Sequence, residues 1–131
     1  MQDNPLYDDV VLDVYDFLDD QINRLNRQGI ARNCIIADPG IGLGKTMAHN
    51  LALLNKTSLF HSLGVPLLLG VSRKGFIGKI TQENVAEGRV IGSVSAALTG
   101  VSQGVQIFRV HDVRETRQAF DMWQTIMFGI K

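Results

Sequence analysis

Residues 67–75 read LLLGVSRKG, an apolar run that ends abruptly in polar and basic residues. A strand covered by helices on both faces has no polar side, so an unbroken apolar run is typical of a buried parallel sheet. A shorter run of this kind, CIIA, occupies residues 34–37, and VQIFRV occupies residues 105–110. The sequence therefore predicts three buried strands, at residues 34–37, 67–71 and 105–110.

Helical patterns precede, separate and follow these strands, over residues 8–28, about 48–63, about 89–102 and about 114–128. In the first pattern, apolar residues recur at spacings of three and four. Asp8 and Asp9 suit its N-terminal end, where free amides favour anions, and Gly29 is placed to end it. Residues 89–102 are rich in small side chains, which let a helix lie close to a sheet.

The order of elements is one helix followed by three strand–helix units, which predicts an α/β fold with parallel strands and right-handed crossovers. The chain has 131 residues, which fits one small domain or half of a larger one. A three-stranded parallel sheet is thin, whereas a (β/α)8 TIM barrel takes about 250 residues. We therefore expect residues 1–131 to form a partial domain, the C-terminal half of a barrel with about three strands and four helices.

The composition excludes several classes of function. Lys and Arg total 13 and Asp and Glu total 13, so no basic excess is available to attract nucleic acid. No run approaches the roughly 20 apolar residues that a membrane span needs. Cys34 is predicted to be a small buried hydrophobe. Because the N-terminus lacks a signal-peptide pattern, the cytoplasm is the expected compartment.

Polar clusters follow all three predicted strands, at residues 38–40 (DPG), 72–74 (SRK) and 109–112 (RVHD). In parallel α/β folds the ligand site lies at the carboxyl ends of the strands. The clusters would therefore bring a carboxylate, an Arg/Lys pair and an Arg/His pair to one rim. Arg109 and His111 alternate along a strand, so their side chains are expected on the same side.

These groups suit a flat polar heterocycle joined to an anion. Asp38 can accept two hydrogen bonds from an amino-pyrimidinone edge, and Lys74 can donate to a ring carbonyl or nitrogen. Arg109 and His111 can hold a phosphate or diphosphate, since a guanidinium offers a fork of donors.

Structural roles are the alternative for several of these residues. Asp38 precedes a proline and also suits a turn. We expect Asp112 to cap the last helix, although it is also placed to fix His111. His49 and His61 lie on a helix without partners, so surface or capping roles are expected for both.

A glycine loop, GIGLGKT, occupies residues 40–46. A phosphate-binding P-loop needs glycine where this chain has Pro39, and a dinucleotide fingerprint needs G-x-G-x-x-G instead of G-x-G-x-G. ATP or NAD binding is therefore not expected. The glycines let the backbone approach a ligand closely and move.

Four motifs resemble, in this order and spacing, those of the dihydropteroate synthase family of the folate pathway. They are DPGIGLGKT at residues 38–46, SRKGFIG at 72–78, GS at 92–93 and RVHDV at 109–113. Residues 1–5 resemble the segment that follows that family's fifth barrel strand. The resemblance implies a (β/α)8 barrel that joins 6-hydroxymethyl-7,8-dihydropterin diphosphate to p-aminobenzoate. The products are 7,8-dihydropteroate and diphosphate, and Mg²⁺ assists.

The resemblance also implies roles for individual residues. Asp38 would bind the pterin edge, Lys74 the pterin carbonyl and ring nitrogen, and Arg109 with His111 the diphosphate. Lys74, Arg109 and His111 would be the catalytic groups. The loop at residues 72–78 would help to seat p-aminobenzoate, and the loop at residues 40–46 would cover it. The implied substrate site comprises Asp38, Gly42, Leu43, Lys45, Arg73, Lys74, Gly75, Arg109 and His111.

Two departures from the family lie beside the expected p-aminobenzoate site. The family usually has Phe where this chain has Leu43, and often Ser where it has Gly75. Loss of a ring and a hydroxyl is expected to weaken p-aminobenzoate binding without affecting the pterin, and sensitivity to sulfonamides stays open. The family's first half also supplies an Asn for the metal and diphosphate, and an Asp and an Asn for the pterin. No residue of this chain replaces them, so we expect no metal ligand here and an inactive isolated chain.

Two other functions stay open. The chain is alternatively a non-catalytic half-barrel whose two open sheet edges pair with a second copy, because unpaired edges invite pairing and symmetric dimers are common. It is alternatively a related pterin-binding methyltransferase that uses methyltetrahydrofolate. Such an enzyme needs no diphosphate pocket, so Arg109, His111 and residues 72–74 favour the synthase.

Overall fold

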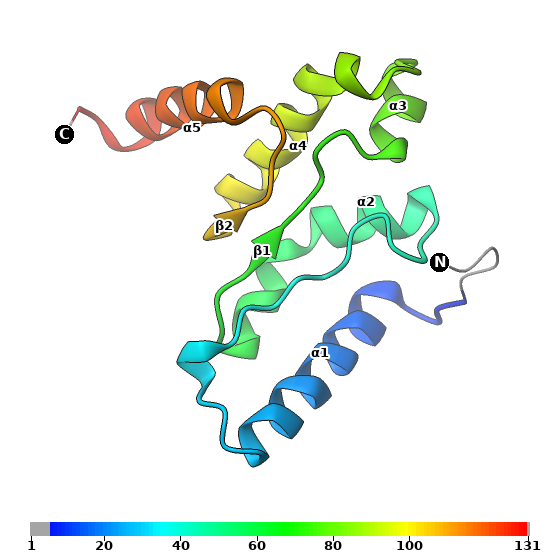
Figure 1. The fold of residues 1–131 in the computed structure, drawn as a ribbon, viewed down its shortest axis with the longest axis vertical. Coiled ribbons are helices and arrows are strands. Elements are labelled where there is room, and N and C mark those ends of the chain that lie inside the picture. The colour runs from blue at the N-terminus through cyan, green and yellow to red at the C-terminus, as the bar shows by residue number, and fades with distance from the viewer. Residues whose placement is uncertain (1–5, 131) are drawn as a thin grey trace.

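The computed structural model describes residues 6–130, so the resemblance noted for residues 1–5 lies outside the described part. Two short strands are present, β1 (Leu68–Leu69) and β2 (Ile107–Phe108). The α-helices are α1 (Val10–Arg27), α2 (Met47–Asn55), α3 (Gly75–Thr81), α4 (Val90–Ser102) and α5 (Val113–Phe128). The 3₁₀ helices are η1 (Arg32–Cys34), η2 (Thr57–Leu63) and η3 (Ala86–Arg89). Figure 1 shows α1 and α5 at opposite ends of the molecule, with the strands between them.

The strands run parallel, as predicted. In β1 and β2, Leu68 pairs with Ile107 and Leu69 with Phe108. On the other side, Ala37 makes a single parallel bridge to Leu67. The three carboxyl ends therefore point in the same direction.

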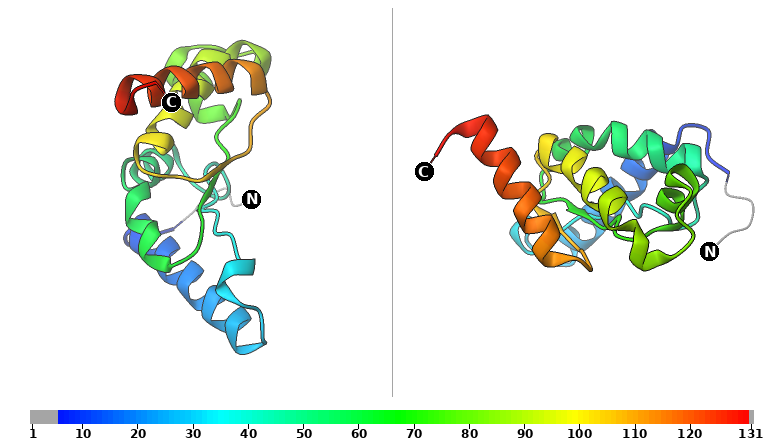
Figure 2. Two further views of the ribbon diagram at one scale, coloured as in Figure 1. Left: turned by 90° about the vertical axis from the view of Figure 1, so that its left-hand side faces the viewer. Right: turned by 90° about the horizontal axis from the view of Figure 1, so that it is seen from above.

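All three predicted strands are too long, because β1 and β2 hold two residues each and β2 is only half-buried. The first, at residues 34–37, differs most from its prediction. Only Ala37 bridges a neighbour, and Cys34 belongs to η1. The expected burial of Cys34 is also wrong, because this free thiol is exposed. Ile35 is buried but Ile36 is 54% exposed. The helices α2, η2 and α4 lie on one side of the strand segments (Figure 2). Residues 34–37 are therefore covered on the face of Ile35 and open on the face of Ile36.

The first helix is confirmed. Asp9 is its N-cap, and the Asp9 carboxylate accepts hydrogen bonds from the amides of Val11 and Leu12. Gly29 follows the helix with a φ of 94°, a left-handed conformation that glycine adopts without steric cost. Most of the apolar stripe is turned inward, and its buried members are Val10, Val11, Val14 and Ile22. Phe17 belongs to the predicted stripe but is 62% exposed.

The second predicted helix, at residues 48–63, is divided into α2 and η2. The division occurs at Thr57, a buried residue whose hydroxyl donates to the carbonyls of Leu53 and Leu54. The stretch at residues 75–88 was not expected to be helical, yet it holds α3 and η3. Phe76 and Ile77 are buried there, so packing overrides the low helix propensity of glycine.

The core lies between the helices and the strands. Its most deeply buried large side chains include Leu53, Phe60, Leu67 and Leu69. Helix α4 approaches the strands as closely as its small residues predicted. A Cβ added at Gly100 would lie 2.6 Å from Leu69 Cδ2, so any other residue would displace the buried Leu69 side chain. Among residues 6–130, no helix is both long and apolar enough to cross a bilayer.

Candidate active site

The ends of the three parallel segments form the candidate site. Asp38 directly follows the bridge at Ala37, Lys74 lies beyond β1, and Arg109 follows β2. Burial lowers the pKa of the Lys74 amine, the Asp38 carboxylate opposes that shift, and the Arg109 guanidinium adds to it. Because the three segments pair side by side and run parallel, these residues lie at one edge of the sheet.

Lys74 is half-buried and reaches toward the glycine loop. Its Nζ donates a hydrogen bond to the carbonyl of Ile41. Gly42 has a φ of 80°, and a Cβ added there would lie 3.0 Å from Lys74 Cδ. A side chain there would be strained by the positive φ and would push the Lys74 side chain aside.

Lys45 fastens the same loop from its other end. Its Nζ donates to the carbonyls of Gly40, at 2.9 Å, and Leu43, at 3.0 Å. Burial lowers the pKa of the Lys45 amine, Lys74 lowers it further, and Asp38 opposes both. Two ammonium groups thus hold the loop over the strand ends through its carbonyls.

Asn50 also positions the loop, and the sequence analysis missed it. This residue of α2 is 4% exposed, and its Oδ1 accepts a hydrogen bond from the Gly42 amide at 2.8 Å. The sequence does contain a signal for this role. Asn50 lies three and four positions before Leu53 and Leu54, so its amide side chain falls on the face of the helix that they bury. A buried amide needs partners, so such a residue points to a specific contact.

Asp38 has the turn role that was the alternative for it. Its Oδ1 accepts a hydrogen bond from the Gly40 amide at 2.8 Å, which is the turn contact expected before a proline. The residue is nevertheless exposed, so the carboxylate is open to a ligand at the rim. The turn contact fixes the carboxylate's direction without burying it.

Arg109 and His111 are exposed at the end of β2. The Arg109 amide donates to the carbonyl of Leu69 at 3.1 Å, so this hydrogen bond to β1 fixes the backbone position of Arg109. His111 contacts Ser72 twice, with its amide 3.2 Å and its Nδ1 2.9 Å from Ser72 Oγ. The loops that follow β1 and β2 are therefore joined beside the expected anion site.

The expected cap at Asp112 is wrong. The residue stands at the N-cap of α5, but its side chain accepts no hydrogen bond from the helix amides. Its carboxylate instead pairs with Arg73, with Oδ1 2.9 Å from Nη2 and Oδ2 3.3 Å from Nε. A forked guanidinium pair is a stronger partner than a single amide, and Arg73 is within reach.

This ion pair predicts a pH dependence of stability. The hydrogen bond from Arg73 lowers the pKa of Asp112 below its ordinary 3.8. A carboxyl whose pKa is lowered by folding stabilises the fold above its unfolded pKa, and this contribution is lost as pH falls through the folded pKa. We therefore expect Asp112→Asn to lower the urea midpoint at pH 7 and to differ less from the parent chain below pH 3.8. A constant difference across this range would contradict the assignment.

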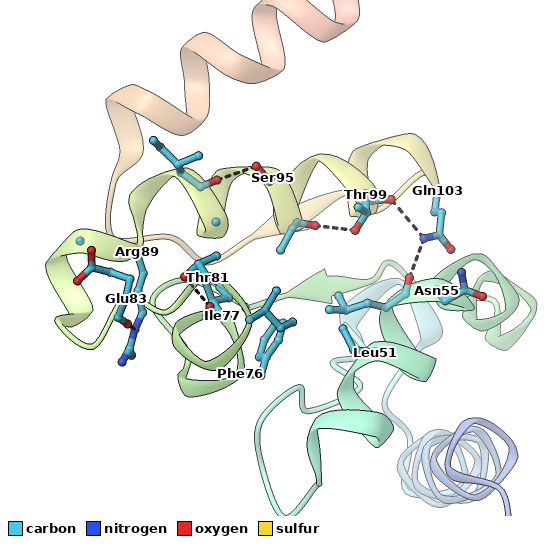
Figure 3. A pocket seen from close by; sticks show the side chains of 16 residues that line it. Leu51, Asn55, Phe76, Ile77, Thr81, Glu83, Arg89, Ser95, Thr99 and Gln103 are labelled. Carbon is cyan, nitrogen blue, oxygen red and sulfur yellow. Dashed lines mark hydrogen bonds between the residues drawn. The ribbon is translucent and has the colours of Figure 1, made fainter.

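Two cavities lie near these elements. One of about 430 Å³ is lined by Gly42, Lys45, Lys74 and Gly75, four of the residues expected at the site. A larger one, of about 740 Å³, lies between α2, α3 and α4 and is lined by none of them. Figure 3 shows apolar side chains such as Leu51, Phe76 and Ile77 around it. The smaller cavity is therefore the one that belongs to the candidate site.

The remaining histidines have structural roles. His49 forms a capping box with Thr46 at the start of α2, as expected. His61 Nε2 lies 2.6 Å from the carbonyl of Gln103. Within residues 6–130, no group of three or more His, Cys, Asp or Glu side chains is arranged to hold a metal ion.

Comparisons with known proteins identify relatives of the chain. A family model described as pterin binding enzyme matches residues 1–111. The chain is 43% identical over 119 residues to the dihydropteroate synthase of Escherichia coli K12, covering 91% of this chain and 42% of that protein. It is 46% identical over 129 residues to that of Neisseria meningitidis serogroup B, covering 96% of this chain and 45% of that protein.

Solved structures agree with these relatives. Dihydropteroate synthase from Stenotrophomonas maltophilia, with imidazole bound in its active site, has a TM-score of 0.96 and 41% identity, covering 100% of this chain and 49% of that one. The Xanthomonas albilineans enzyme in complex with 7,8-dihydropteroate has a TM-score of 0.93 and 42% identity, covering 95% of this chain and 47% of that one. The resemblance and the half-barrel fold are thus confirmed. The chain spans about half the length of the proteins it matches.

Proposed function

This chain belongs to the family of pterin-binding enzymes, and on that basis we propose that it forms the C-terminal half of a dihydropteroate synthase. The proposed reaction joins 6-hydroxymethyl-7,8-dihydropterin diphosphate to p-aminobenzoate and releases diphosphate. One observation carries this proposal for the chain's own residues. Asp38, Lys74 and Arg109 follow three segments that pair side by side in parallel, so one carboxylate and two cations lie at the same edge of the sheet.

These groups divide the proposed chemistry between them. Asp38 accepts hydrogen bonds from the amino edge of the pterin, and Lys74 donates to its carbonyl and ring nitrogen. The bond between the pterin methylene carbon and the diphosphate oxygen breaks as the amine nitrogen bonds to that carbon and loses its proton to water. Arg109 and His111 stabilise the negative charge that develops on the diphosphate. No covalent enzyme intermediate is needed.

We propose that the Mg²⁺ of this reaction is held by side chains outside this chain. The described residues do not fit a metal site by themselves, because no cluster of three or more suitable side chains exists within residues 6–130. Arg109 and His111 are therefore the groups of this chain that meet the leaving diphosphate.

Two positions in the loops bear on the second substrate. Leu43 is 56% exposed at the glycine loop. Nothing lies within 4 Å of a Cβ added at Gly75, so the serine common in the family would fit there without strain. We propose that these two residues weaken binding of p-aminobenzoate, and of sulfonamides that compete with it, while the pterin groups stay intact.

A second function is favoured by the open side of the sheet. In the described part of the chain, β2 pairs with β1 alone, so its other edge has no backbone partner there. Large apolar side chains are also exposed on α5, among them Met122, Ile126 and Phe128. Unpaired edges and apolar patches attract partners, so we propose that the chain forms a homodimer when it is alone.

A free thiol at Cys34 fits the reducing cytoplasm, where we place the protein.

The decisive experiment is complementation. The chain is mixed with the N-terminal half of the Escherichia coli relative, and dihydropteroate is measured with both substrates and Mg²⁺ present. We expect product from the mixture and none from either half alone. A well-folded complex that binds a pterin analogue without forming product would contradict the proposed synthase activity.

Two further measurements test the alternatives. Inhibition of pterin binding by added diphosphate separates the synthase from a methyltransferase. The native mass of the isolated chain tests the homodimer.

A further inference from the structure

The main-chain pairing of β1 and β2 ends at Arg109, the first residue of the candidate site after β2. The last backbone hydrogen bond between them runs from the Arg109 amide to the carbonyl of Leu69. Beyond that point, two consecutive side-chain contacts join the segments that follow β1 and β2. Ser72 contacts His111, and the next residue, Arg73, pairs with the residue after His111, Asp112. Side chains thus continue the parallel pairing into the loops.

Arg73 is held at its backbone as well as at its side chain. Its φ of 59° lies in the left-handed region, which non-glycine residues rarely occupy. Its amide donates to Ser93 Oγ at 2.8 Å, and its carbonyl accepts a hydrogen bond from Arg89 Nη1 at 2.9 Å. An unusual conformation that several partners fix is commonly found where a site needs defined geometry.

The surroundings of this pair differ from those of the other ion pair in the described residues. The Arg73 and Asp112 side chains are 25% and 15% exposed, and they join residues 39 positions apart. The Arg117–Asp121 pair lies within one helix, and its side chains are 59% and 62% exposed. The Arg73–Asp112 pair therefore fixes two loops relative to each other, whereas the Arg117–Asp121 pair joins two exposed residues of the same helix.

We propose that the Arg73–Asp112 ion pair is a positioning element that sets the separation of Lys74 from His111. Lys74 directly follows Arg73, and His111 directly precedes Asp112, so the pair lies between the groups assigned to the pterin and to the diphosphate. This inference rests on the proposed function only in the roles given to Lys74 and His111. The pair's own contacts are independent of those roles.

The first measurement needs no enzymatic activity. Acylation of the Lys74 amine is followed by mass spectrometry as a function of pH, with exposed Lys56 as the internal reference for the reagent. The variants are Arg73→Lys, Arg73→Met, Asp112→Asn and the double variant Arg73→Met/Asp112→Asn. Matched controls are Arg117→Met and Asp121→Asn, which break the exposed pair on α5.

Burial lowers the pKa of Lys74, while Asp38 raises it and Arg109 lowers it. If the pair positions Lys74, breaking it exposes the amine to water, and the pH midpoint of its acylation rises toward the usual range for lysine. We expect this rise in Arg73→Met and Asp112→Asn, the same rise in the double variant, and a smaller one in Arg73→Lys. The Arg117 and Asp121 variants should match the parent chain.

The second measurement uses the complemented enzyme. Misplacement of a reacting group by about 1 Å costs up to roughly 100-fold in rate, so we expect kcat to fall about 10- to 100-fold while KM changes little. An unchanged Lys74 midpoint in Asp112→Asn and Arg73→Lys overturns the proposal, whatever happens to the rate. If complementation itself fails, the acylation profiles still decide. Arg73→Lys keeps the charge and all backbone contacts, so it carries the test if Arg73→Met does not fold.

Discussion

Replacing Lys74 by methionine is expected to lower kcat/KM of the complemented enzyme by roughly 100- to 1,000-fold, the loss typical of removing one preorganised electrostatic donor. Methionine keeps most of the side-chain volume and removes the charge, so the change isolates the ammonium group. The effect should be large because Lys74 is half-buried beside Asp38 and Arg109, where water screens charges poorly.

Lys56 provides the matched control for this prediction. It is exposed at the C-terminal end of α2 and does not line the cavity at the candidate site. Lys56→Met should therefore leave kcat/KM within about twofold of the parent, since substitutions on exposed surfaces have small effects. Equal losses in the two variants would show that the loss of any lysine charge, and not the position of Lys74, governs the rate.

The same substitution has a second, structural consequence. The Lys74 amine donates to the carbonyl of Ile41 and so holds the glycine loop while no ligand is bound. Without that contact, Lys45 still holds the loop through Gly40 and Leu43, and Asn50 holds it through Gly42. Faster hydrogen exchange at the amides of residues 40–44 in Lys74→Met would report this loosening separately from the rate.

The sequence was informative where local rules and topology agree. The stripe on α1 and its cap at Asp9 follow from periodicity and amide chemistry, and both are present. The gathering of Asp38, Lys74 and Arg109 follows from topology alone, because parallel strands deliver their carboxyl ends to one edge. Neither inference needed knowledge of contacts between distant residues.

The errors arise where distant contacts decide the local structure. Asp112 has the position of a cap, but Arg73, distant in sequence, takes its carboxylate. Helix α3 contains two glycines and forms because Phe76 and Ile77 bury their side chains against the rest of the fold. Cys34 sits in an apolar run whose neighbours pair too little to bury it. Such contacts join residues far apart in the chain, so no pattern within one segment reveals them.

Phe60→Ala is expected to destabilise the chain by about 3–5 kcal/mol, the usual cost of emptying a large buried aromatic site. Phe60 is fully buried in η2, and its ring lies 5.9 Å from that of Tyr15 on α1, so it ties that helix to the body of the fold. Small domains are stable by about 5–15 kcal/mol, so the loss would consume a large part of the total. Leu59→Ala is the matched control, because the neighbouring Leu59 is 44% exposed and should cost far less.

Urea unfolding of both variants measures the difference between their free energies of unfolding. The reactivity of Lys74 then shows whether the loss of core packing also disturbs the candidate site. The strand ends that carry Asp38 and Lys74 depend on the core beneath them, where Leu67 and Phe60 are both buried. If that core is one cooperative unit, Phe60→Ala should also raise the acylation midpoint of Lys74 at urea concentrations where the parent chain is still folded. Destabilisation equal to that of Leu59→Ala would mean that η2 is peripheral. The rigidity of the rim would then have to come from loop contacts such as those of Lys45, Asn50 and Lys74.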